Sequence, residues 1–133
     1  DIYLHYSDDG GATWSAEILV NDDTVHAYQF HPGLTVAPDG TVSISFYDTR
    51  DDQPSNKKTH RYLAVSTDGG ATFGANVRIT TAQSDETVGF DANQYGDYQG
   101  LDAGSNGLLG AVWTDHRPNA TRNEDMWTAP ALP

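Results

Sequence analysis

The sequence predicts an all-β fold built from repeated antiparallel strands. One eight-residue pattern, Ser-x-Asp-x-Gly-x-Thr-aromatic, occurs twice, at Ser7–Trp14 and Ser66–Phe73, 59 residues apart. Apolar and polar residues alternate in several short segments, most clearly where Val42, Ile44 and Phe46 share one strand face. Glycine is frequent, at 13 of 133 residues, and apolar residues rarely recur at helical spacing. These three observations favour strands joined by tight turns.

The composition fits one domain of 14.4 kDa, whose apolar residues (37%) are sufficient for a core. The net charge of −12 argues against nucleic acid or an anionic membrane as a partner, because such binding needs clustered Lys and Arg. No apolar run approaches the roughly 18 residues of a membrane-spanning helix, so membrane insertion is not expected. The chain contains no cysteine, so its fold forms without disulfides.

The repeated pattern predicts a self-capped β-hairpin. Its serine and aspartate oxygens can accept hydrogen bonds from backbone N–H groups of the turn. Its Gly-Gly pair can take the positive φ values of a tight turn. The aromatic residue is expected to fold over the turn and become buried. We therefore assign a structural role to ten residues: Ser7, Asp9, Gly11, Thr13, Trp14, Ser66, Asp68, Gly70, Thr72 and Phe73. A catalytic or metal-binding role for the two aspartates is disfavoured, because two identical turns cannot both lie at one active site.

The strands are expected in a regular order along the chain. Segments 1–6 and 14–20 flank the first repeated turn, and a polar loop follows at 21–31. Strands at 32–37, 41–47, 60–65 and 76–80 enclose a tight turn at 38–40, a charged loop at 48–59 and the second repeated turn. After a loop at 81–95, strands are expected at 96–103, 108–114 and 125–128, with a long connection at 115–124. The segment Phe46–Arg50 recurs as Trp113–Arg117, 67 residues later, which supports a structural repeat.

The repeated pattern resembles the Asp box, or bacterial neuraminidase repeat, of sialidases and sialidase-like β-propellers. The resemblance implies that residues 1–133 are part of a propeller of four-stranded antiparallel blades, six in number in the sialidases. Residues 1–20 would then be the last two strands of one blade, 32–80 one complete blade, and 96–129 three strands of a third. Two to three blades cannot close a ring, so the remaining blades are expected from a longer chain or from other copies.

Blade topology predicts where a functional site would lie. The short turns should gather on one face and the long loops at 21–31, 48–59, 81–95 and 115–124 on the other. Binding residues are usually carried by long loops on a rigid scaffold. The Asp boxes are therefore expected on the face opposite the site.

The residues that enter the innermost strands, His31, Asp97 and Tyr98, should lie nearest the central channel. Sialidases use a tyrosine nucleophile, an aspartate acid/base and arginines that hold the sugar carboxylate, so the resemblance makes Tyr98 and Asp97 the candidate catalytic residues. The candidate ligand-binding residues are His31, Arg50, Tyr95 and Arg117. For both arginines the alternative is structural, a pairing with the aspartate of their own Asp-x-Arg segment.

No cofactor is expected, and the histidines do not have the spacing of a zinc site. The pairs Asp22-Asp23 and Asp51-Asp52 leave calcium open as a ligand, because calcium needs several convergent oxygens. The alternative is that these pairs are solvated surface.

Three functions are consistent with the sequence. The first is a secreted or cell-surface sialidase-like module that binds or processes glycans, with a carbohydrate or glycoprotein as its partner and glycoside hydrolysis as its chemistry if it is an enzyme. The second is a non-catalytic adhesion or protein-interaction scaffold. The third is a fragment of a true exo-sialidase.

Overall fold

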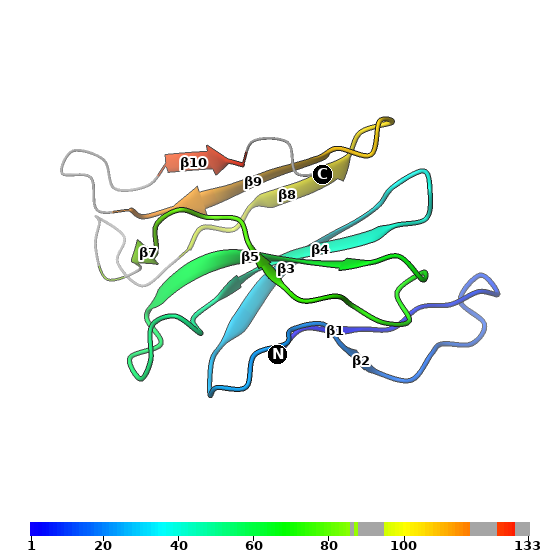
Figure 1. Ribbon diagram of the computed structural model, residues 1–133, viewed down its shortest axis with the longest axis horizontal. Coiled ribbons are helices and arrows are strands. Elements are labelled where there is room, and N and C mark those ends of the chain that lie inside the picture. Colours follow the sequence, from blue (N-terminus) through cyan, green and yellow to red (C-terminus); the bar gives the residue numbers. More distant parts are fainter. Residues whose placement is uncertain (86, 88–94, 118–124, 130–133) are drawn as a thin grey trace.

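A computed structural model describes residues 1–85, 87, 95–117 and 125–129 of the chain (Figure 1). These residues form three antiparallel β-sheets and contain no helix, which confirms the all-β prediction. Parts of two predicted loops, at 86, 88–94 and 118–124, lie outside the described residues. Among the described residues there is no helix long and apolar enough to cross a membrane.

Each sheet follows the order of the chain. The first pairs β1 (Tyr3–Leu4) with β2 (Ile18–Leu19). The middle sheet has the order β3 (Gln29–Val36), β4 (Val42–Asp48), β5 (Lys58–Ser66) and β6 (Val77–Arg78), and β7 (Ser84–Asp85) also pairs with β5. The third has the order β8 (Gln99–Ala103), β9 (Leu109–Asp115) and β10 (Asp125–Thr128). Strands that are neighbours in the order of each sheet are therefore antiparallel partners.

Three predicted loops, 21–31, 48–59 and 81–95, contain residues that belong to strands. Strand β3 begins at Gln29 rather than at Pro32, because the ladder continues past a bulge between Phe30 and Gly33 to pair Gln29 with Asp48. His31 lies in this bulge with a φ of 48°. Strand β7 lies inside the predicted loop 81–95, and its partners in β5 belong to the predicted loop 48–59. Both differences arise from pairing between distant segments, which local patterning does not report.

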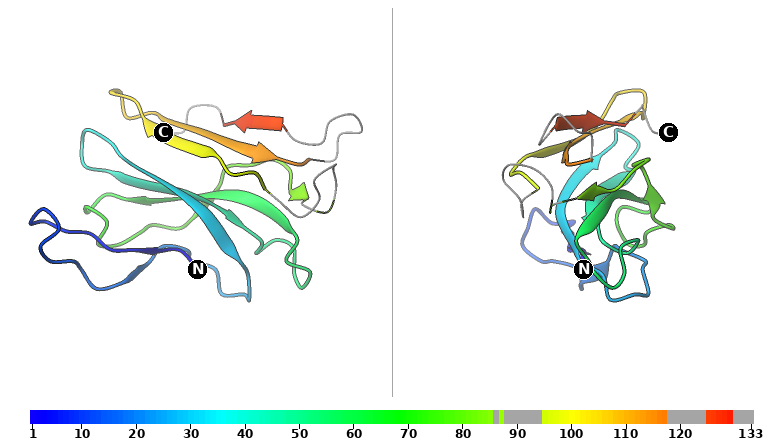
Figure 2. Two further views of the ribbon diagram at one scale, coloured as in Figure 1. Left: turned by 180° about the vertical axis from the view of Figure 1, so that it is seen from behind. Right: turned by 90° about the vertical axis from the view of Figure 1, so that its left-hand side faces the viewer.

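The three sheets are stacked, with β1–β2 on one side of the middle sheet and β8–β9–β10 on the other (Figures 1 and 2). Side chains of β4 alternate between the two interfaces. Val42, Ile44 and Phe46 pack against Ile2 and Val20, next to the first sheet. On the opposite face, Tyr47 joins a second cluster with Ala111 and Trp113 of the third sheet. Every residue of β4 is buried, so this strand is the centre of the described structure.

Figure 1 shows the short turns of all three sheets at one end and the longer connections at the other. The turn end contains both repeated turns and the connections β3–β4 and β8–β9. The long-loop end contains the connections β2–β3 and β4–β5. The two repeated turns therefore lie far from the loops in which a binding site was expected.

The two repeated turns have the same hydrogen bonds. In each, the aspartate accepts the backbone N–H of the threonine at 2.9 Å and its hydroxyl at 2.6 Å. The serine hydroxyl accepts the second glycine's N–H at 2.8 Å. Hydrogen bonds from the Thr72 hydroxyl and backbone lower the pKa of Asp68 to about 2. These carboxylates are occupied in holding their own turns.

The aromatic residues of the two turns differ in burial. Phe73 packs against the cluster between the first two sheets. Trp14, its counterpart, is 64% exposed, so the expectation that it is buried is wrong. The first sheet lies over the side of the middle sheet on which Phe73 packs, whereas no described sheet lies on the corresponding side of β1–β2.

Candidate functional site

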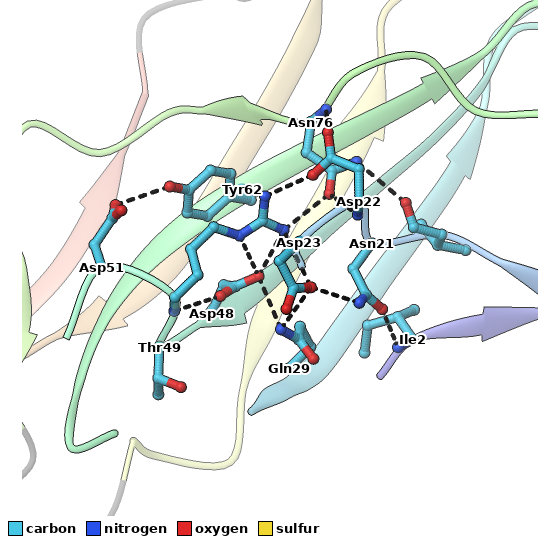
Figure 3. Close-up of polar contacts among 12 residues, drawn as sticks. Ile2, Asn21, Asp22, Asp23, Gln29, Asp48, Thr49, Asp51, Tyr62 and Asn76 are labelled. Carbon is cyan, nitrogen blue, oxygen red and sulfur yellow. Dashed lines mark hydrogen bonds and ion pairs between the residues drawn. The ribbon is translucent and has the colours of Figure 1, made fainter. Parts of the chain in front are cut away.

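The long-loop end contains a polar network centred on Arg50 (Figure 3). Its Nε donates to Asp48 Oδ2 at 2.9 Å, Nη1 to Asp22 Oδ1 at 2.6 Å and Nη2 to Asn76 Oδ1 at 3.0 Å. The guanidinium also lies over the Tyr62 ring, 4.3 Å from its centroid. Partial burial lowers the pKa of Arg50, but hydrogen bonds to Asp48 and Asp22 outweigh it and raise that pKa above its ordinary value. Every guanidinium nitrogen of this arginine is thus engaged within the protein.

Asp23 extends the network towards the first sheet. It accepts hydrogen bonds from Asn21 Nδ2 at 2.7 Å and Gln29 Nε2 at 3.0 Å. Asn21 Oδ1 in turn accepts the backbone N–H of Ile2 at 2.8 Å. The pair Asp22-Asp23 therefore joins the 20–28 loop to the first two sheets, and a calcium ion bound there would have to displace Arg50.

The pair Asp51-Asp52 shapes the β4–β5 connection. Asp52 accepts the backbone N–H groups of Lys57 and Lys58, both at 2.9 Å, and the hydroxyl of Ser55. Asp51 accepts the hydroxyl of Tyr62 at 2.8 Å. No three acidic or histidine side chains among the described residues are arranged to hold a metal ion, and calcium stays a prediction.

Arg117 repeats the local geometry of Arg50. Its Nε donates to Asp115 Oδ2 at 2.9 Å, the same contact that Arg50 makes two residues after Asp48. Its Nη1 donates to Thr81 Oγ1 at 3.1 Å, and its guanidinium lies 4.1 Å from the centroid of the Trp127 ring. For both arginines the contacts support the structural alternative over direct ligand binding.

An aromatic cluster lies between the middle and third sheets at the long-loop end. The rings of Phe30, Tyr47 and Tyr95 pack with centroids 5.1 to 5.3 Å apart. Tyr95 is buried and its hydroxyl donates to the Lys57 carbonyl at 2.6 Å, so this candidate ligand-binding residue belongs to the interior. His31 is exposed at the margin of the cluster, 5.5 Å from the Phe30 ring.

The candidate catalytic residues lie beside this margin. Asp97 and Tyr98 immediately precede β8, and Tyr98 is 82% exposed. The next residue, Gln99, donates through Nε2 to the His31 carbonyl, which holds the start of β8 against β3. Tyr98 has no hydrogen-bond partner in the described part of the chain. The arrangement therefore presents an aromatic side chain to solvent, without a base in contact with it.

The predicted site residues fall into three places. His31, Tyr95, Asp97 and Tyr98 belong to the junction of β3 and β8. Arg50 stacks on Tyr62, which packs in the cluster on the opposite face of the middle sheet. Arg117 stacks on Trp127 of the third sheet. Among the described residues, neither Arg50 nor Arg117 contacts Tyr98, so these candidates are not brought together as a sialidase-type constellation.

Sequence reasoning missed a buried arginine on β5. Arg61 is 1% exposed, its Nη2 donates to Ser45 Oγ at 3.0 Å, and its guanidinium lies 4.6 Å from the Tyr47 ring centroid. Its Nε and Nη1 have no hydrogen-bond partner among the described residues, and burial lowers its pKa to about 10. The one available signal was the position of Arg61 inside the predicted strand 60–65, directly before the apolar run Tyr62–Val65.

Comparison of the chain with models of known protein families and with curated protein sequences finds no match.

Proposed function

We propose that this chain is part of a sialidase-like Asp-box β-propeller, and that its long-loop end binds a glycan at the junction of β3 and β8. The proposal is supported by the two matching turns, by the four consecutive antiparallel strands of the middle sheet and by the repeated Asp-x-Arg geometry. A module of this kind acts outside the cell, on a carbohydrate or glycoprotein.

The observation that carries the binding site is the exposure of Tyr98. A tyrosine with 82% of its surface exposed offers both ring faces and a hydroxyl to a ligand. His31 adds a second accessible ring on the adjoining strand, and the Gln99 contact fixes the two strands relative to each other. Aromatic surfaces with a few polar groups are the usual lining of small-ligand sites, and sugar rings have apolar C–H faces that pack on such rings.

Binding is better supported than sialic acid hydrolysis. An exo-sialidase needs free arginines for the substrate carboxylate, whereas Arg50 and Arg117 are already paired with Asp48 and Asp115. We therefore propose a glycan-binding surface first and treat hydrolysis at Tyr98 as a separate test.

A protein-interaction scaffold is the second candidate, favoured by the 20–28 loop. This loop lies at the long-loop end, where the proposed glycan site also lies. Within it, Tyr28 is 57% exposed and Val25 is also exposed. Exposed apolar residues gathered on a loop are typical of protein contact surfaces.

The test compares two exposed tyrosines. Saturation-transfer NMR against a panel of neutral and sialylated oligosaccharides would identify a ligand, and its affinity would then be measured for Tyr98→Ala and for the control Tyr28→Ala. The proposal expects at least about a tenfold loss of affinity for Tyr98→Ala, equivalent to about 1.4 kcal/mol, and no loss for the control. Absence of glycan binding, or equal binding by Tyr98→Ala, would contradict it.

Hydrolysis is tested with Tyr98→Phe and a fluorogenic sialoside. Loss of turnover with retained binding would assign Tyr98 as the nucleophile. If the wild type and Tyr98→Phe both bind the sialoside and neither hydrolyses it, the protein is a glycan-binding module without hydrolase activity.

A further inference from the structure

Arg61 is a buried cation without a carboxylate partner among the described residues. The other arginines in the described part of the chain each pair with a carboxylate, at 2.8, 3.6 and 2.9 Å: Arg50 with Asp48, Arg78 with Asp51 and Arg117 with Asp115. The chain has 19 acidic residues, so carboxylates are plentiful. Arg61 is nevertheless enclosed without one, and it is only 1% exposed to solvent.

The groups around Arg61 are neutral. Its Nη2 donates to Ser45 Oγ at 3.0 Å, whereas Nε and Nη1 have no hydrogen-bond partner within the described structure. Burial lowers the pKa of Arg61 to about 10, so the guanidinium is still charged at neutral pH. The Tyr47 hydroxyl favours this charged form, but burial raises the pKa of Tyr47 itself to about 12 and keeps it neutral. A full positive charge is therefore buried without a compensating negative charge, which is costly.

The scaffold does not require a cation at this position. The 59-residue repeat relates Arg61 to Ile2, and the two residues make the same contact with the next strand. The carbonyl of Arg61 accepts the backbone N–H of Ile79 at 2.9 Å, and that of Ile2 accepts the N–H of Val20 at 3.0 Å. Ile2 is buried against the middle sheet, as Arg61 is towards the third. An apolar side chain thus fills the equivalent place, and packing alone does not explain the arginine.

We propose that Arg61 binds a small monatomic anion, chloride, between the middle and third sheets. A water molecule could accept a hydrogen bond from Nε or Nη1, but only an anion also compensates the charge. The enclosure favours a monatomic ion over a carboxylate or sulfate, because Ser45 is 0% and Trp113 2% exposed. The site lies apart from the proposed glycan site and does not depend on it.

A cavity at the turn end offers a route into this interface. It has a volume of about 140 Å³ and lies between the two sheets, where Ser43 and Leu109 line it together with Asp39 and Gly107 of the short turns. Ser43 is two residues from Ser45 on the same face of β4, and its buried hydroxyl has no hydrogen-bond partner among the described residues. Small hydroxyl side chains therefore follow β4 from the cavity towards Arg61.

The experiment measures stability against chloride at constant ionic strength. Urea denaturation is followed from 5 to 500 mM sodium chloride, with sodium gluconate replacing chloride so that general screening stays the same. A ligand that binds only the folded protein raises the folding equilibrium constant in proportion to 1 + [L]/Kd. The expected result for the wild type is an increase of at least about fivefold across this range.

Matched variants locate the ion. Arg61→Met should abolish the chloride dependence, whereas Arg78→Met, at an arginine on β6 that is paired with Asp51, should keep it. No chloride dependence in the wild type, or equal dependence in Arg61→Met, would overturn the proposal.

A second measurement does not depend on the folding of a variant. Crystals of the wild type grown in sodium bromide should give an anomalous scattering peak in contact with the Arg61 guanidinium. Density for water alone at this place, or bromide only at the protein surface, would contradict the assignment.

Discussion

The hydroxyl of Tyr47 donates a 2.6 Å hydrogen bond to the carbonyl of Thr114, and the two residues occupy the same place in the two copies of the 67-residue repeat. Equivalent positions of neighbouring sheets are therefore in direct contact. The middle sheet therefore packs one face against the first sheet and the other face against the third.

Tyr47→Phe should lower the free energy of unfolding by about 1–2 kcal/mol, because the buried carbonyl of Thr114 loses its donor. The measurement is urea denaturation. Tyr3→Phe serves as the control, since the Tyr3 hydroxyl is exposed and its hydrogen bond to Asp1 is 3.4 Å long. Equal effects of the two variants would show that the intersheet bond contributes nothing.

Arg50→Met should destabilise the protein by about 3–5 kcal/mol, because Asp48 is fully buried and would lose its cation. Chemical denaturation measures the change. Arg78→Met is the matched control: its ion pair with Asp51 is exposed and 3.6 Å long, so a loss of at most about 1 kcal/mol is expected.

The double variant Arg50→Met with Asp48→Asn tests whether the unpaired charge of buried Asp48 causes the loss of stability in Arg50→Met. Removing the unpaired charge should recover part of the stability lost in Arg50→Met. Further destabilisation would mean that Asp48 is held mainly by its other contacts, with Gln29 and the Arg50 backbone N–H.

Phe73→Ala should cost about 2–4 kcal/mol, since its partly buried ring packs against the core between the first two sheets. Trp14→Ala, at the equivalent position of the first repeat, should change stability by less than about 1 kcal/mol because the ring is exposed. Thermal and urea denaturation of the two variants would provide the comparison. A large effect of Trp14→Ala would indicate that its ring is covered in solution.

Asp68 should make stability depend on pH in acid. Hydrogen bonds from Thr72 lower its pKa from 3.8 to about 2 in the folded protein. A carboxyl with a depressed folded pKa contributes stability above the unfolded value, and that contribution is lost as the pH falls towards the folded value. The difference in unfolding free energy between the wild type and Asp68→Asn should therefore shrink from pH 5 to about pH 2, as urea titrations at fixed pH would record. A difference independent of pH would exclude this linkage.

Arg61→Met should leave stability unchanged or raise it by about 1–3 kcal/mol. Within the part of the chain that the structure describes, the buried guanidinium has no carboxylate partner and two of its nitrogens have no hydrogen bond, so its desolvation is poorly compensated. Equilibrium denaturation of Arg61→Met and the wild type would measure the difference in unfolding free energy. A large destabilisation would show that its contacts with Ser45 and Tyr47 outweigh the cost of burying the charge.

Much of the local structure could be predicted from the sequence because its interactions are local. The repeated turns close through hydrogen bonds between residues two to four positions apart, and their residue types allow little else. The same holds for Val42, Ile44 and Phe46, whose alternation predicted one buried face, and for the antiparallel order of consecutive strands.

The candidate site was less predictable. The sequence placed Arg50 and Tyr95 among ligand-binding residues, with pairing to Asp48 as the alternative for Arg50. That local contact is present, but further partners of Arg50 and Tyr95 lie 28 and 38 residues away, at Asp22 and Lys57. Such pairings depend on how loops fold back over the sheets, which no local pattern encodes. Tyr98 and His31 are exposed, and the strands that carry them are joined by the contact between Gln99 and the His31 carbonyl, 68 residues apart.

The sequence alone therefore determined the all-β class, the two identical turns and the order of the main strands, since these follow from residue type and spacing within short segments. Only the tertiary structure decided that Trp14 is exposed while Phe73 is packed, that Arg50 also binds Asp22, and that Leu34 is exposed beside the first sheet. The physical reason is that burial and ion pairing depend on which sheet lies beside a residue, and the repeats share their turns but not their neighbours.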